Sequence, residues 1–157
     1  MDSERLMVAA EGYLQLQMAE EALQELENLS GKEAHSLRSL ELQLAAFMMM
    51  GEWSTGAKLA MQLCRMSPQQ HSYFLHAGYC LHECGDTLLA RSVLESGPLS
   101  LQSDALYHYN MGCYCAVLGE LDQARTFVLE SFEMDPELRK QAASDDDLKG
   151  LMLEEPG

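Results

Sequence analysis

The sequence predicts an all-helical fold built from one repeated unit. Apolar residues recur every three or four positions, and the period-two alternation of strands never lasts. The pattern also returns at a shift of 34 residues without a gap. We therefore expect a single domain, 1–157, with these segments: repeats 3–36, 37–70, 71–104 and 105–138, and a C-terminal cap at 139–157.

Two columns of the alignment define the repeat. One holds Gln17, Gly51, Gly85 and Gly119, and the other holds Ala22, Gly56, Ala90 and Ala124. Glycine favours the left-handed backbone that ends many helices, and small side chains allow helices to approach closely. Each unit is therefore predicted to be two antiparallel helices joined by a tight turn.

The ends of the units are marked by proline and by capping residues. Ser67-Pro68 and Asp135-Pro136 predict helix ends, because proline cannot continue the hydrogen-bond ladder. In the third unit Gly97-Pro98 predicts an early end, followed by an exposed linker and Asp104 as the next N-cap. After the fourth unit, Ser144 is expected to cap a further short helix.

The repeated pattern resembles the tetratricopeptide repeat (TPR). The resemblance covers residues 3–138 and is most specific in "YNMGCYCAVLGELDQARTFVLESFEMDP" and "GEWSTGAKLAMQLCRMSP". It implies a right-handed α-solenoid whose first helices line a concave groove. The residues after 138 are similar to the end-piece that follows the last repeat in small bacterial TPR proteins.

Composition limits the partners. A formal net charge of −15 disfavours nucleic acid and membrane surfaces, because both are anionic. The five cysteines are an odd number without the spacing of a disulfide framework, and the longest apolar run, "LQLAAFMMM", is too short to cross a bilayer. We expect a cytoplasmic protein.

Catalytic motifs are absent from the sequence, so an enzyme is not expected and no cofactor is predicted. His76, Cys80 and Cys84 lie four residues apart on one helical stripe and raise the alternative of a metal- or redox-active domain. The same stripe is the one that a repeat helix buries, and the paired-ligand spacings of known zinc sites are missing. Burial in the core is the preferred interpretation of these cysteines.

The TPR resemblance assigns groove residues to the first helix of each unit. They are Met7, Glu11, Leu14, Arg38, Glu41, Met48, Leu75, Tyr79, His82, Leu106, Tyr109 and Cys113. This apolar surface with acidic edges is expected to bind an apolar or amphipathic segment carrying some positive charge, and a carboxylate ligand is disfavoured.

The resulting prediction is a non-catalytic scaffold or adaptor that binds a protein or peptide partner. One alternative is a chaperone of secreted translocator proteins, because small size, acidity and an apolar groove are similar to type III secretion chaperones. A further alternative is that the groove is covered by the terminal helix of the chain itself or, in a homodimer, by a second copy.

Overall fold

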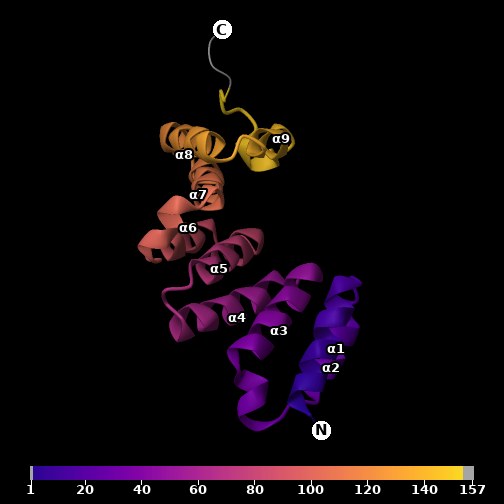
Figure 1. The fold of residues 1–157 in the computed structure, drawn as a ribbon. Helices are drawn as coiled ribbons and strands as arrows, with labels where there is room; N and C mark the ends of the chain where they lie inside the picture. The colour runs from indigo at the N-terminus through magenta and orange to yellow at the C-terminus, as the bar shows by residue number, and fades with distance from the viewer. Residues whose placement is uncertain (1, 154–157) are drawn as a thin grey trace. The chain divides into compact units, whose positions relative to one another are not determined.

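The computed structural model describes residues 2–153, which contain helices and no strand. The helices are paired as the repeats predict, which confirms the all-α solenoid class. The chain divides into two compact units, Met1–Pro68 and Gln69–Gly157 (Figure 1). The single domain inferred from the repeats stays a prediction.

The first unit contains two helical pairs. Its elements are α1 (Ser3–Gln15), α2 (Ala19–Glu27), the 3₁₀-helix η1 (Gly31–His35), α3 (Leu37–Met49) and α4 (Trp53–Met66). Within each pair the helices pack together, and α1 also contacts α3. The core between α1 and α2 is apolar, with Leu6, Met7, Ala10, Ala22, Leu26 and Leu29 buried.

The second unit contains two more pairs and the C-terminal elements. These are α5 (His71–Glu83), α6 (Thr87–Glu95), η2 (Leu99–Ser103), α7 (Ala105–Val117), α8 (Leu121–Met134), α9 (Leu138–Ala143) and η3 (Asp146–Leu148). The pairs α5/α6 and α7/α8 pack closely, α5 also contacts α7, and η3 packs on α7. The first helices of successive repeats therefore lie side by side within this unit.

The turn between the two helices of each repeat has the same form four times. Gly51, Gly85 and Gly119 have φ angles of 72°, 94° and 84°, the left-handed region predicted for them. Gln17 occupies the equivalent place in the first repeat with φ 62°, the one non-glycine residue with positive φ in residues 2–153. The turn at Gln17 has the same backbone hydrogen bond as the three glycine turns, here from Met18 N to Tyr13 O at 2.8 Å.

Replacing Gln17 by glycine is expected to stabilise the protein by about 0.5–1 kcal/mol. The substitution removes the strain of a residue with a side chain in the left-handed region. Glycine also gives the unfolded chain more conformational freedom, and this offsets part of the gain. Urea denaturation followed by circular dichroism measures it, with Gly119→Ala as the matched opposite change, expected to cost about 1–2 kcal/mol. A loss of stability in Gln17→Gly would contradict the assignment of strain to this residue.

Close helix approach explains the second column of the repeat. Ala22, Ala90 and Ala124 are fully buried, and Gly56 is buried as well. A side chain at Gly112 would collide with α8, since a Cβ there would lie 2.4 Å from Val128 Cγ2. The small residues therefore set the distance between paired helices.

Two local expectations differ from the structure. The linker after Pro98 is exposed as expected, apart from the almost completely buried Leu101, but it forms the 3₁₀-helix η2; Asp104 caps α7, accepting from Leu106 N at 2.9 Å. The cap of the last short helix is Asp145 instead of Ser144, with Asp145 accepting from Asp147 N at 3.0 Å. Within residues 2–153 no helix combines the length and apolar character needed to span a membrane.

Candidate functional site

The candidate site is the face that α5 and α7 form within the second unit. These are the first helices of the third and fourth repeats, where the sequence places groove residues. In the structure η3 packs on α7, so residues 146–148 lie over this face. We call residues 145–148 the C-terminal turn.

Asp145 is held by donors from α7. Its Oδ2 atom accepts a hydrogen bond from the Tyr109 hydroxyl at 2.7 Å and a long one from Cys113 Sγ at 3.7 Å. Its Oδ1 atom accepts from the backbone N–H of Asp147 at 3.0 Å, which closes the turn on itself. One carboxylate therefore both shapes the turn and attaches it to the helix.

Asp147 is held by α5 through His82. The distance from His82 Nε2 to Asp147 Oδ2 is 2.7 Å, and His82 Nδ1 lies 2.8 Å from the Thr87 hydroxyl. An ionised carboxylate only accepts hydrogen bonds, so Nε2 carries a proton and donates it. The imidazole ring also packs on Tyr114, with 4.9 Å between ring centroids.

An apolar contact completes the turn. Leu148 follows Asp147 directly and is 3% exposed. Two carboxylates at positions i and i+2 and a leucine at i+3 therefore account for the attachment of the turn.

Burial raises the pKa of the Tyr109 phenol, and the hydrogen bond to Asp145 raises it further. Burial, followed by the charges of Asp145 and Asp147, raises the pKa of the Cys113 thiol. Both groups therefore stay protonated and act as neutral donors at neutral pH. Cys113 is not positioned as a reactive thiolate.

The structure corrects the expectation that all the predicted groove residues line an open surface. Met7, Leu75, Tyr109 and Cys113 are buried, and Cys113 lies against Asp145 of the C-terminal turn. Met7 belongs to the core of α1 and α2. Helix periodicity gives the side of a helix on which a residue lies, but not which later segment covers it.

The other predicted residues keep some solvent contact. Exposed or partly exposed are Glu11, Leu14, Arg38, Glu41, Met48, Tyr79, His82 and Leu106. In the first unit Arg38 donates to both carboxylate oxygens of Glu4 at 2.8 Å and lies 3.4 Å from Glu11, so it joins α3 to α1. These ion pairs are exposed to solvent and contribute little to stability.

The sequence disfavours a carboxylate ligand, yet two donors on this face hold carboxylates of the chain's own C-terminal turn: the hydroxyl of Tyr109 and the imidazole of His82. The available signal in the sequence was the run "DDDL" directly after the last repeat.

The potential metal ligands differ from those predicted. In the described part of the chain, one group of three potential ligand atoms lies within 4.8 Å, formed by Cys113, Asp145 and Asp147. His76, Cys80 and Cys84 do not form such a group; Cys80 is completely buried and Cys84 is exposed. Both aspartates of the observed group already have protein donors.

Two further hollows lie at equivalent places in the two units. One, of about 760 Å³, is lined by residues of α6, α7 and α8, and its lining includes Glu95, Glu120, Asp122 and Glu130. The other, of about 450 Å³, is lined by residues of α2, η1, α3 and α4 and is mostly apolar. A shift of 68 residues relates Leu23, Gln43 and Leu59 of the second hollow to Arg91, Met111 and Phe127 of the first.

Comparison with solved structures identifies the fold. The chain matches MamA residues 41 to the end from Desulfovibrio magneticus RS-1 with a TM-score of 0.79 and 19% identity, covering 94% of this chain and 87% of that one. It matches TTC0263, a thermophilic TPR protein of Thermus thermophilus, with a TM-score of 0.70 and 19% identity, covering 92% and 81%. MamA MSR-1 C2 is similar at a TM-score of 0.75 and 11% identity, covering 87% and 79%.

No protein-family profile matches the sequence, and no curated protein matches it significantly. The structural likeness and the 34-residue repeats together show a TPR-like fold.

Proposed function

We propose that the chain is a non-catalytic scaffold that binds an apolar or amphipathic segment of a partner protein on the faces made by its first helices. One observation carries the proposal: the α5/α7 face already holds a short segment, the C-terminal turn, through Tyr109, His82 and a buried leucine. Helical repeats with such faces are suited to peptide recognition. The TPR-like fold agrees with this role.

The buried cysteines favour a binding protein over a redox or metal-dependent one. Burial raises the pKa of Cys64 and of Cys80 to about 11, so both remain thiols at neutral pH. Thiolate is the form that attacks a substrate or binds zinc. With the composition, this supports a non-catalytic cytoplasmic protein.

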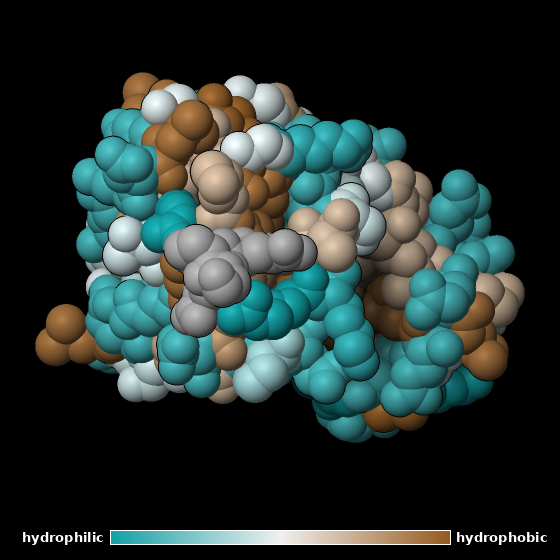
Figure 2. Space-filling model, turned by 90° about the horizontal axis from the view of Figure 1, so that it is seen from above, coloured by the Kyte–Doolittle hydropathy of each residue, from teal (hydrophilic) through white to brown (hydrophobic). Residues whose placement is uncertain are grey.

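Exposed apolar residues provide further contact area for a partner. Tyr79 on α5 is 41% exposed and Leu106 on α7 is 45% exposed. In Figure 2 hydrophilic side chains cover most of the visible face, and hydrophobic ones gather in patches between them. In the hollow of α6, α7 and α8, Arg91 already pairs with Glu95 at 3.3 Å and with Glu120 at 2.7 Å, so the charge of its carboxylates is partly compensated.

Selection from a random peptide library tests the proposal and does not require that the partner be identified. We expect the immobilised chain to enrich peptides with apolar anchors, and Tyr79→Ala and Leu106→Ala to weaken their binding by about 1–2 kcal/mol each. Leu88→Ala is the matched control, because Leu88 is 61% exposed but lies on α6. Equal binding by all three variants would remove these faces from the proposal.

Two narrower predictions rest on the sequence alone. A chaperone of secreted translocator proteins would select long apolar segments of such proteins over short peptides. A homodimer would show a doubled mass in analytical ultracentrifugation. Both stay predictions.

A further inference from the structure

The C-terminal turn shows which chemistry the α5/α7 face accepts. Asp145 receives the Tyr109 hydroxyl, Asp147 receives His82, and Leu148 is buried directly after them. The side chain of the middle residue, Asp146, is 84% exposed and pairs with Lys149 at 2.8 Å within the same segment. The recognised pattern is therefore Asp-x-Asp-Leu.

The pattern is largely independent of the rest of the tail. Asp145 Oδ1 caps the N–H of Asp147 within the turn itself, so any segment with this spacing can form the same turn. The contacts with the helices come from side chains of the turn. A segment of another protein with the same pattern can make the same contacts.

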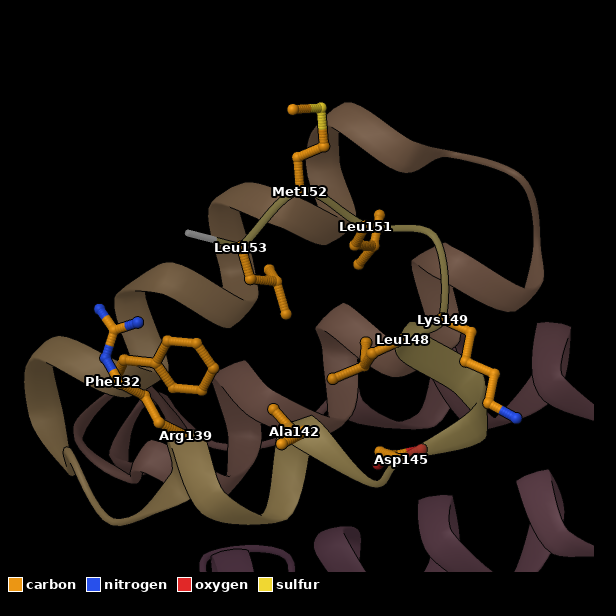
Figure 3. A pocket seen from close by; sticks show the side chains of 10 residues that line it. Phe132, Arg139, Ala142, Asp145, Leu148, Lys149, Leu151, Met152 and Leu153 are labelled. Carbon is orange, nitrogen blue, oxygen red and sulfur yellow. The ribbon is translucent and has the colours of Figure 1, made fainter. Parts of the chain in front are cut away.

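The chain around the turn is loosely packed. After Leu148, residues 149–153 pass over a pocket of about 530 Å³ whose lining includes Phe132 of α8 and Ala142 of α9. Figure 3 shows Leu148, Leu153 and Phe132 facing this pocket, whereas Met152 points away from it. Met152 is 80% exposed, and its carbonyl oxygen accepts from Arg125 Nε at 2.6 Å.

Few buried side chains hold the segment that precedes the turn. The helix α9 has six residues, of which Leu138 and Ala142 are buried. A segment with so few buried contacts opens at a lower free energy than the helical core of the unit. The turn can therefore leave the face while α5 to α8 remain folded.

Electrostatics limit the strength of this attachment. The donors that reach the two carboxylates are a phenol, a thiol, an imidazole and a backbone amide, within a chain of formal net charge −15. Repulsion from the rest of the protein weakens the attachment of the turn and, equally, the binding of an acidic partner segment. Attachment to the same chain compensates, because it gives the turn a high effective concentration.

We propose that the α5/α7 face binds an acidic partner segment with two carboxylates at i and i+2 followed by leucine, and that the C-terminal turn is the built-in competitor for this face. The inference rests on the proposed scaffold function and specifies the partner of this one face. A partner must displace residues 145–148 to bind. The affinity for a partner is therefore set by the difference between the free energy of the partner's contacts with the face and that of the turn's own contacts.

A labelled peptide with the sequence of residues 143–151 is the probe, and its binding to the full-length chain is measured by fluorescence anisotropy. In the variant Asp145→Asn/Asp147→Asn the turn is weakened, and we expect it to bind the peptide at least about tenfold tighter than the unmodified chain does. A peptide with asparagine at both anchoring positions should bind this variant about tenfold more weakly. Asp146→Asn/Glu137→Gln changes the net charge equally through two exposed residues and should bind like the unmodified chain.

Amide NMR signals of residues 145–151 report whether the turn is released. Release in the double variant together with peptide binding supports the inference. Release without peptide binding overturns the acidic partner, while enrichment in the library selection would still support the scaffold function. Unchanged signals in the double variant, or no displacement of the turn from the unmodified chain by excess peptide, would show that the turn is a permanent part of the fold.

Discussion

Replacing Tyr109 by alanine lowers the free energy of unfolding by about 3–5 kcal/mol, the usual cost of truncating a buried aromatic residue. Tyr109 is 1% exposed, and its hydroxyl is a donor to Asp145. Truncation leaves a cavity beneath the C-terminal turn and removes the hydroxyl group that donates a hydrogen bond to the Asp145 carboxylate. Urea denaturation followed by circular dichroism gives the difference.

Two companion variants separate packing from hydrogen bonding. Tyr109→Phe keeps the ring and removes the hydroxyl, so we expect a cost of about 1–3 kcal/mol. Leu106→Ala, on the same helix but 45% exposed, should cost less than about 1 kcal/mol. If Tyr109→Ala cost no more stability than Leu106→Ala, Tyr109 would be a surface residue of the groove, as the sequence suggested.

The repeat itself could be predicted from the sequence because each column has a local physical cause. The turn glycines take positive φ angles, and Ala22, Ala90 and Ala124 are fully buried between paired helices. Even the exception is informative, since Gln17 adopts the glycine conformation in the first repeat. Local backbone geometry and helix spacing depend on residues at most a few turns apart.

The site could be predicted only in part, because whether its residues are exposed depends on contacts with the C-terminal turn, which lies far along the chain. Helix position placed Tyr109, Cys113 and His82 on the correct helices. Their partners are Asp145 and Asp147, and Tyr109 lies 36 residues before Asp145. Periodicity gives no information on where a tail without repeats will pack, so the sequence left open whether a partner, a second copy or the end of the chain itself covers this face.

Gly112→Ala tests the close contact between α7 and α8, and we expect it to cost about 1–3 kcal/mol. The new methyl group would lie 2.4 Å from Val128 Cγ2 and 3.2 Å from the carbonyl oxygen of Ala124. Neither group can move easily, because Val128 is fully buried and β-branched and the carbonyl belongs to the backbone of α8.

A double-mutant cycle shows whether the collision with Val128 is the cause. Val128→Ala alone should cost about 2 kcal/mol through the lost methyl groups. In the double variant the new methyl group fills the space left by valine. The cost of the double variant should therefore be smaller than the sum of the two single costs by about 1 kcal/mol or more. Gly12→Ala is the control for helix propensity: its Cβ would meet nothing within 4 Å, and it should gain about 0.5–1 kcal/mol. Additive costs in the cycle would instead assign the effect of Gly112→Ala to contact with the backbone of α8.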